Sequence, residues 1–245
     1  MNNSIRVALL LLFAPAALSA SSVDRSIEAT ANASYNYRTV LAQRVSIHAR
    51  NGIIVLTGTV EDAEDKALAG DTIAHIPGVE IVLNDVTVKP TVAEFSDAWI
   101  ALKVRSRLLV KARVSAAATT VAVLDGVVTL GGTADTAAQR ELTAVYAREI
   151  ESVKSVTNDM VVNDAAPGSP PAGEIIDDAS ITSQVRCALL TEKATRGLKP
   201  RITTSDGVIA ISGEAGSAVE KSLITKLAED VRGVKSVENR MVVKG

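Results

Sequence analysis

The chain repeats one pattern three times, and this repetition limits its possible folds more than any other feature. The segment NGIIVLTGTV, which begins at Asn51, returns as DGVVTLGGTA from Asp125 and as DGVIAISGEA from Asp206, so the copies start 74 and 81 residues apart. A second block returns at the same spacings, as PGVEIVLNDVTVK from Pro77, ESVKSVTNDMVVN from Glu151 and RGVKSVENRMVVK from Arg232. Two blocks in one register indicate an internal repeat of one structural unit.

A third block predicts the helix that opens each unit. It reads DAWIALKVRSRLLV from Asp97 and DASITSQVRCALLT from Asp178, and we expect each Asp to cap the helix N-terminus. Apolar residues recur at i, i+4 and i+8 and form one stripe: Ile100, Val104 and Leu108, and Ile181, Val185 and Leu189. The first copy is weaker here, because VDRSIEATANA near Val23 aligns only with a one-residue shift.

A hairpin follows the helix in each copy. Asn or Asp followed by Gly is typical of a type I′ turn, because both central residues need a positive φ. The pairs are Asn51-Gly52, Asp125-Gly126 and Asp206-Gly207. A further glycine ends the second strand of each copy, where a missing Cβ lets a helix approach or a bulge form: Gly58, Gly132 and Gly213.

A second helix and a last strand complete the unit. The helix places apolar residues such as Leu142 and Ile150 on one face, and the strand of the middle copy spans Val153 to Val162. We therefore predict an α+β fold of three tandem αββαβ sandwiches. Two helices cover only one face of a three-stranded sheet, so the other face is open or meets a neighbour.

The N-terminus has the pattern of a secretory signal peptide. MNNSIRVALLLLFAPAALSA places Arg6 before an apolar run and ends with small residues at Ala20. The apolar run is shorter than the ~20 residues that span a bilayer, so a transmembrane anchor is the weaker alternative. Cys187 is the single cysteine, which excludes an intramolecular disulfide.

The predicted organisation follows from these signals: a signal peptide over 1–20, a first domain with a divergent first helix over 21–90, a second over 95–164, a linker over 165–176 and a third over 177–245. The linker contains AAPGSPPAGE, whose Pro and Gly content is typical of a semi-extended segment. We expect domains 2 and 3 to be the more loosely tethered pair.

Composition argues against nucleic-acid binding, and the repeats argue against catalysis. The formal charge is −2 and aromatic residues make up 2% of the chain, which suits neither phosphate neutralisation nor base stacking. The two histidines, His48 and His75, have no counterpart in the other copies, so we expect surface positions and no catalytic residue. The acidic run EDAED from Glu61 fits a helix N-terminus better than a metal site. No cofactor is expected.

One flank of the first helix differs between the middle copy and the third copy. At about 100° per residue, Trp99, Lys103 and Arg107 share one side of the middle helix, beside its apolar stripe. The third copy has Ser180, Gln184 and Ala188 at these positions. A tryptophan with nearby cations suits an anionic membrane surface. The alternative is a tryptophan that covers part of the core beside a solvated charged face.

The repeats resemble the BON domain family, named for bacterial osmotically inducible protein Y and nodulation-related proteins. The resemblance rests on the helix DAWIALKVRSRLL, the hairpin DGVVTLGGT and the ending GV-x-x-V-x-N-x-x-V, and it covers nearly all of the chain after residue 20. The middle copy departs from it with Ser152 in place of Gly78 and Gly233.

The resemblance implies a periplasmic or envelope location, no catalysis and binding of phospholipid membranes under osmotic or envelope stress. Some periplasmic members of the family are linked to chaperone-like activity. Two hypotheses follow: a protein that binds anionic phospholipid, or a soluble holdase whose open sheet faces bind unfolded envelope proteins.

Overall fold

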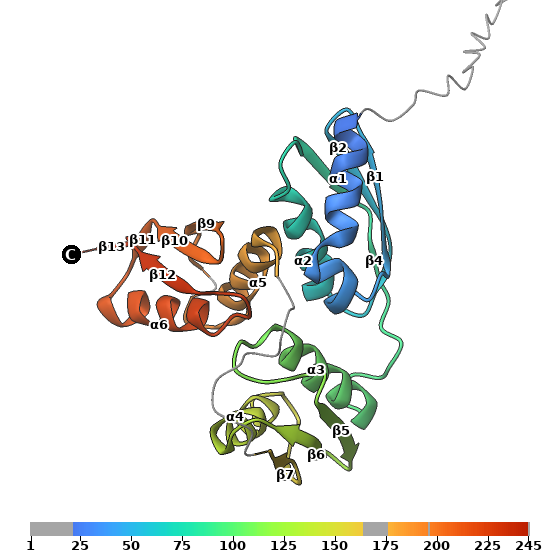
Figure 1. Ribbon diagram of the computed structural model, residues 1–245, viewed down its shortest axis with the longest axis vertical. Coiled ribbons are helices and arrows are strands. Elements are labelled where there is room, and N and C mark those ends of the chain that lie inside the picture. Colours follow the sequence, from blue (N-terminus) through green and yellow to red (C-terminus); the bar gives the residue numbers. More distant parts are fainter. Residues whose placement is uncertain (1–21, 164–175, 196, 245) are drawn as a thin grey trace, which may run out of the picture.

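The computed structural model describes residues 22–163, 176–195 and 197–244. The signal peptide predicted over 1–20 and most of the linker predicted over 165–176 lie outside the described residues. Three domains of the predicted αββαβ order surround a common centre (Figure 1). Two helices pack on one face of each small sheet, and each domain has its own hydrophobic core. The α+β fold of three repeats is confirmed.

The elements have the following bounds. Domain 1 contains α1 (Ser22–Ala33), the π-helix η1 (Asn36–Val40), β1 (Val45–Arg50), β2 (Ile53–Val60), α2 (Ala63–Ala74), β3 (Ile81–Asn84) and β4 (Thr87–Val88). Domain 2 contains α3 (Asp97–Val110), β5 (Thr119–Leu124), β6 (Val127–Ala134), α4 (Ala137–Arg148), β7 (Ser155–Asn158) and β8 (Val161–Val162). Domain 3 contains α5 (Asp178–Thr191), β9 (Arg201–Ser205), β10 (Val208–Ser212), β11 (Glu214–Ala215), α6 (Ala218–Glu229), β12 (Ser236–Asn239) and β13 (Val242–Val243).

The last strand of each domain is divided in two, where a single strand was predicted. In domain 2, β5 and β6 pair antiparallel, and β7 and β8 both lie parallel to β6. Between them the Asn158 side chain accepts a hydrogen bond from Met160 N and donates one to Arg140 O on α4. The break turns Met160 into the core, where it is 4% exposed. Asn84 and Asn239 make the same contacts in the other domains.

The first helix of each domain is fastened to the hairpin turn by an aspartate. Asp97 is the first residue of α3 and not its cap, because the Ser96 hydroxyl accepts the hydrogen bond from Trp99 N. The Asp97 carboxylate instead accepts hydrogen bonds from Asp125 N at 2.7 Å and Gly126 N at 2.8 Å. Asp178 does the same in domain 3, where Asp177 is the cap, and Asp24 accepts a hydrogen bond from Gly52 N in domain 1. The predicted capping role of Asp97 and Asp178 is therefore wrong.

The turns themselves have the predicted backbone. Asn51, Asp125 and Asp206 have φ between 51° and 52°, and the glycines after them have φ between 75° and 78°. For the glycine at the end of the second strand, the helix alternative of the prediction is wrong in domains 1 and 2. A Cβ on Gly58 would lie 2.3 Å from Arg44 O, and one on Gly132 would lie 2.1 Å from Ala118 O. The close neighbour is thus the backbone before the first strand, and not a helix.

Domain 3 also contacts domain 2 directly, at the C-terminal end of α3. The Asp230 carboxylate binds Lys111 Nζ at 2.5 Å and accepts a hydrogen bond from the Tyr146 hydroxyl. Arg232 N donates to Val110 O at 2.8 Å. Linker composition could not predict this, since the contact depends on residues far from the linker.

Replacement of Asp97 by alanine should destabilise domain 2 by ~1–3 kcal/mol, because two backbone amides of the hairpin turn lose their partner. Urea unfolding followed by the fluorescence of Trp99, the single tryptophan, measures this. Asp159→Ala removes an exposed carboxylate of the same domain and is the control. Equal unfolding midpoints for the two variants would show that the Asp97 contact does not stabilise the domain.

Replacement of Ser152 by glycine should stabilise domain 2 by about 1 kcal/mol, because Ser152 has φ 68° and a side chain disfavours this region. Gly78 and Gly233 have φ 91° and 89° at the matching positions. The same urea experiment applies, with Ser155→Gly, at an exposed strand residue, as the control that should lose stability. An unchanged or lower midpoint for Ser152→Gly would contradict this reading of the backbone.

Candidate functional site

The predicted flank lies on one side of α3, next to the buried stripe of that helix. Ile100 and Val104 are no more than 1% exposed, whereas Trp99, Lys103 and Arg107 line a cavity of about 700 Å³. Residues from all three domains line this cavity, including Asp62 and Glu64 of domain 1 and Gln184 and Cys187 of domain 3. The flank therefore faces the centre of the molecule.

Lys103 forms an ion pair with domain 1. Its Nζ lies 2.6 Å from Asp62 Oδ2 and 3.6 Å from Glu64 Oε2, at the N-terminus of α2. Burial by itself lowers the pKa of Lys103, but the hydrogen bond to Asp62 and the nearby carboxylates raise it above its usual value. Lys103 is consequently charged and paired, and its side chain is 20% exposed.

Trp99 covers the edge of the core at the start of α3. Its ring contacts Phe95 edge-on with centroids 5.2 Å apart, and Lys103 Nζ lies 5.8 Å from the ring centroid. That distance is within the range of a cation–π interaction. Arg107, one turn further along, lies 3.7 Å from Glu149 of its own domain and keeps a side-chain exposure of 35%. An ion pair of this exposure contributes ~0.2–1 kcal/mol.

The wall of domain 1 that faces Lys103 is acidic. The Asp62 side chain caps α2 by accepting a hydrogen bond from Asp65 N at 2.9 Å, as the run EDAED predicted. Burial, together with the charge of Asp62, raises the pKa of Asp65 to about 6 although Arg44 is 3.0 Å away. These acids belong to a different repeat from α3, and no pattern within the sequence of α3 points to them.

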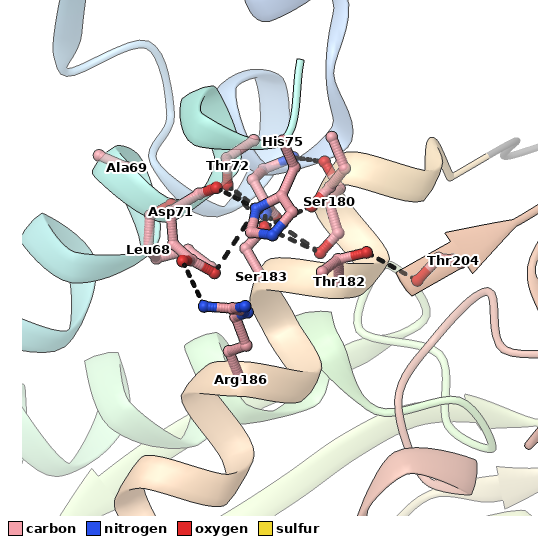
Figure 2. A network of polar contacts seen from close by, with 12 residues as sticks. Leu68, Ala69, Asp71, Thr72, His75, Ser180, Thr182, Ser183, Arg186 and Thr204 are labelled. Carbon is pink, nitrogen blue, oxygen red and sulfur yellow. Dashed lines mark hydrogen bonds and ion pairs between the residues drawn. The ribbon is translucent and has the colours of Figure 1, made fainter. Parts of the chain in front are cut away.

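The matching face of α5 also packs against domain 1. Ser180 is fully buried and Gln184 is 3% exposed. Gln184 Nε2 donates to Asn36 Oδ1 at 2.6 Å, and Asn36 N donates to Ser180 Oγ at 3.1 Å. Figure 2 shows the neighbouring contacts between α2 and α5, where the Thr72 and Ser183 hydroxyls lie 2.9 Å apart. The difference between the two helix flanks thus corresponds to two kinds of interdomain contact.

An ion pair reinforces this second interface. Arg186 Nη1 lies 3.5 Å from Asp71 Oδ1, and Figure 2 shows Asp71 between Arg186 and His75. Each pair of domains is therefore joined by an ion pair. The sequence contained one signal for the domain 1 contact: the first copy departs from the pattern at its first helix, where the structure has Asn36 in η1.

Neither histidine lines the central cavity. His48 is exposed, and His75 is half-buried with its Nδ1 2.6 Å from Asp71 O. Residues 22–163, 176–195 and 197–244 contain no group of three or more His, Cys, Asp or Glu side chains placed to hold a metal ion. Burial raises the pKa of the Cys187 thiol to about 12, so this thiol is protonated and unreactive at neutral pH.

The helices in the described part of the chain are all too short or too polar to cross a membrane.

Comparisons with known proteins place the repeats in one family. The chain is 30% identical to osmotically-inducible protein Y of Escherichia coli over 60% of this chain and 73% of that protein. It is 34% identical to outer membrane lipoprotein DolP of Haemophilus influenzae over 46% of this chain and 60% of that protein. The C-terminal domain of CdsD from Chlamydia trachomatis matches with 14% identity and a TM-score of 0.25 over 86% of this chain and 96% of that chain, which is too weak for an argument. The BON domain model matches residues 23–90, 96–164 and 177–245, and the chain therefore belongs to the BON domain family.

Proposed function

We propose that the protein is a non-enzymatic periplasmic protein of the stressed cell envelope that binds anionic phospholipid surfaces through the flank of α3. The observation that carries this proposal is the position of Trp99, Lys103 and Arg107 beside the core stripe of α3. Packing of the domain core requires neither cation. The names of the relatives, one osmotically inducible and one an outer membrane lipoprotein, agree with an envelope setting.

The chemistry of the flank suits a lipid headgroup layer. Each cation near an anionic leaflet contributes about 1 kcal/mol of attraction. The Trp99 ring adds an apolar contribution to the binding free energy, because tryptophan side chains are enriched at the interface between membrane and water. The first contribution weakens with salt, because the Debye length falls from ~10 Å at 0.1 M to ~3 Å at 1 M, whereas the second persists.

The double substitution Lys103→Glu with Arg107→Glu should abolish binding to anionic vesicles, since two attractive charges become repulsive. Co-sedimentation with vesicles of phosphatidylcholine and phosphatidylglycerol measures the bound fraction. The control Arg148→Glu with Lys154→Glu makes the same charge change at exposed residues of domain 2 and should retain binding. Binding by the Lys103/Arg107 variant at the parent level, or no binding by the parent, would reject the proposal.

A holdase is the second candidate, and the open sheet face of domain 1 favours it. Ile53, Ile81 and Leu83 are between 37% and 50% exposed there, and Val55 lies between His48 and Leu83 in the strand register. The other domains have polar residues at the β3 positions: Ser155 and Thr157 in domain 2, and Ser236 and Glu238 in domain 3. Exposed aliphatic patches of this kind bind apolar segments of other chains.

The holdase candidate predicts that Ile81→Glu with Leu83→Glu lowers the protection of an unfolded outer-membrane protein against aggregation. Light scattering of the diluted client measures this protection. The matched control, Ser155→Glu with Thr157→Glu, places the same charges on the sheet of domain 2 and should protect like the parent. If both variants protect equally, the sheet face of domain 1 does not bind the client.

A further inference from the structure

The central cation of the proposed lipid-binding flank is paired with domain 1 in this structure. Lys103 is held by Asp62 and Glu64, and all three residues line the central cavity. We propose that the N-terminus of α2 is an autoinhibitory lid, which neutralises the flank of α3 and releases it when an anionic surface competes for Lys103. This inference rests on the proposed function, because it describes how the same site is regulated.

The ion pairs that hold the lid closed are accessible to water and to salt ions. The side chains of Lys103, Asp62 and Glu64 are 20%, 30% and 60% exposed. The other two interfaces each contain deeply buried polar contacts. Asn36 and Gln184 are no more than 3% exposed between domains 1 and 3, beside the more exposed Arg186–Asp71 pair, and Lys111 is 8% exposed between domains 2 and 3. Exposed ion pairs are screened by salt much more than buried ones. The contact between the N-terminus of α2 and Lys103, in the middle of α3, is therefore the one that opens most readily.

The far end of α3 supplies a pivot for this opening. Tyr35 Oη donates to Leu109 O at 2.7 Å, and Tyr35, Val40 and Leu68 form a small apolar cluster with Leu109 and Val110. This cluster holds the C-terminal end of α3 against domain 1. Separation can therefore begin at Trp99 and Lys103 while the domains remain joined.

Lys103 keeps an anionic partner when the lid opens. Its ammonium group exchanges carboxylate oxygens of domain 1 for phosphate oxygens of the lipid, and both are anionic acceptors. A ligand shifts such an equilibrium only if it binds one state better than the other. An anionic surface meets this condition, since the carboxylates of Asp62 and Glu64 repel it while the lid is closed.

The variant Asp62→Asn with Glu64→Gln tests the lid. Asparagine keeps the capping ability of Asp62, so α2 should remain intact. With one cation freed, we expect about fivefold tighter binding to vesicles of phosphatidylcholine and phosphatidylglycerol. Glu141→Gln with Asp159→Asn removes the same two charges from exposed positions of domain 2 and controls for net charge. A gain in the first variant that exceeds the gain in the control supports the lid.

A measurement without lipid separates the two proposals. Acrylamide quenching of Trp99 should increase in the Asp62/Glu64 variant and in the parent at high salt, because the partly buried Trp99 lines the cavity that widens when the lid opens. Equal quenching and equal vesicle binding by variant and parent would overturn the lid and leave the proposed function in place. Failure of both proteins to bind vesicles would overturn the proposed function and the lid together.

Discussion

Each domain depends on a carboxylate in the first turn of its first helix that binds the backbone of its hairpin turn. The positive φ values of the turn leave two amide groups of domain 2 outside the strand ladder, and Asp97 accepts hydrogen bonds from both. The carboxylate also lies at the positive end of the helix dipole, which favours its charge. One residue thereby fixes the distance and direction between helix and sheet. The same contact in domain 3 explains why the helix and hairpin blocks keep a common spacing.

This contact determines which side of the first helix faces away from its own sheet, and that side carries the differences between domains. On α3 it presents Lys103 to the carboxylates of domain 1. On α5 it presents the buried Ser180 and Gln184 to Asn36. Substitutions on this side leave the core stripe intact, so one fold can form an exposed ionic contact in one domain and a buried polar contact in another.

The features that could be predicted from the sequence are those that recur in each repeat and depend on neighbouring residues. The hairpin turns, the helices with their apolar stripes and the three units follow from periodicity and turn chemistry, which act over a few residues. The prediction that Asp97 caps the helix failed because Ser96 satisfies the helix amides, and this leaves Asp97 to the turn. The acidic partner of Lys103 lies 41 residues away in another repeat, and no periodic pattern connects the two. Contacts between repeats depend on surfaces that the repeat does not constrain.

The burial of each interdomain ion pair determines whether the pair can exchange partners. Lys111 is 8% exposed beside Asp230 and also lies 4.8 Å from the ring centroid of Tyr146 of its own domain, so another anion can reach Lys111 only if domains 2 and 3 separate. Removal of one partner from such a pair is strongly destabilising. Lys103 meets Asp62 and Glu64 where water already reaches the charges, and water or another anion can take over their interactions. A buried ion pair such as that of Lys111 and Asp230 suits a permanent contact between domains. A contact that must exchange partners requires water-accessible charges, such as those of Lys103, Asp62 and Glu64.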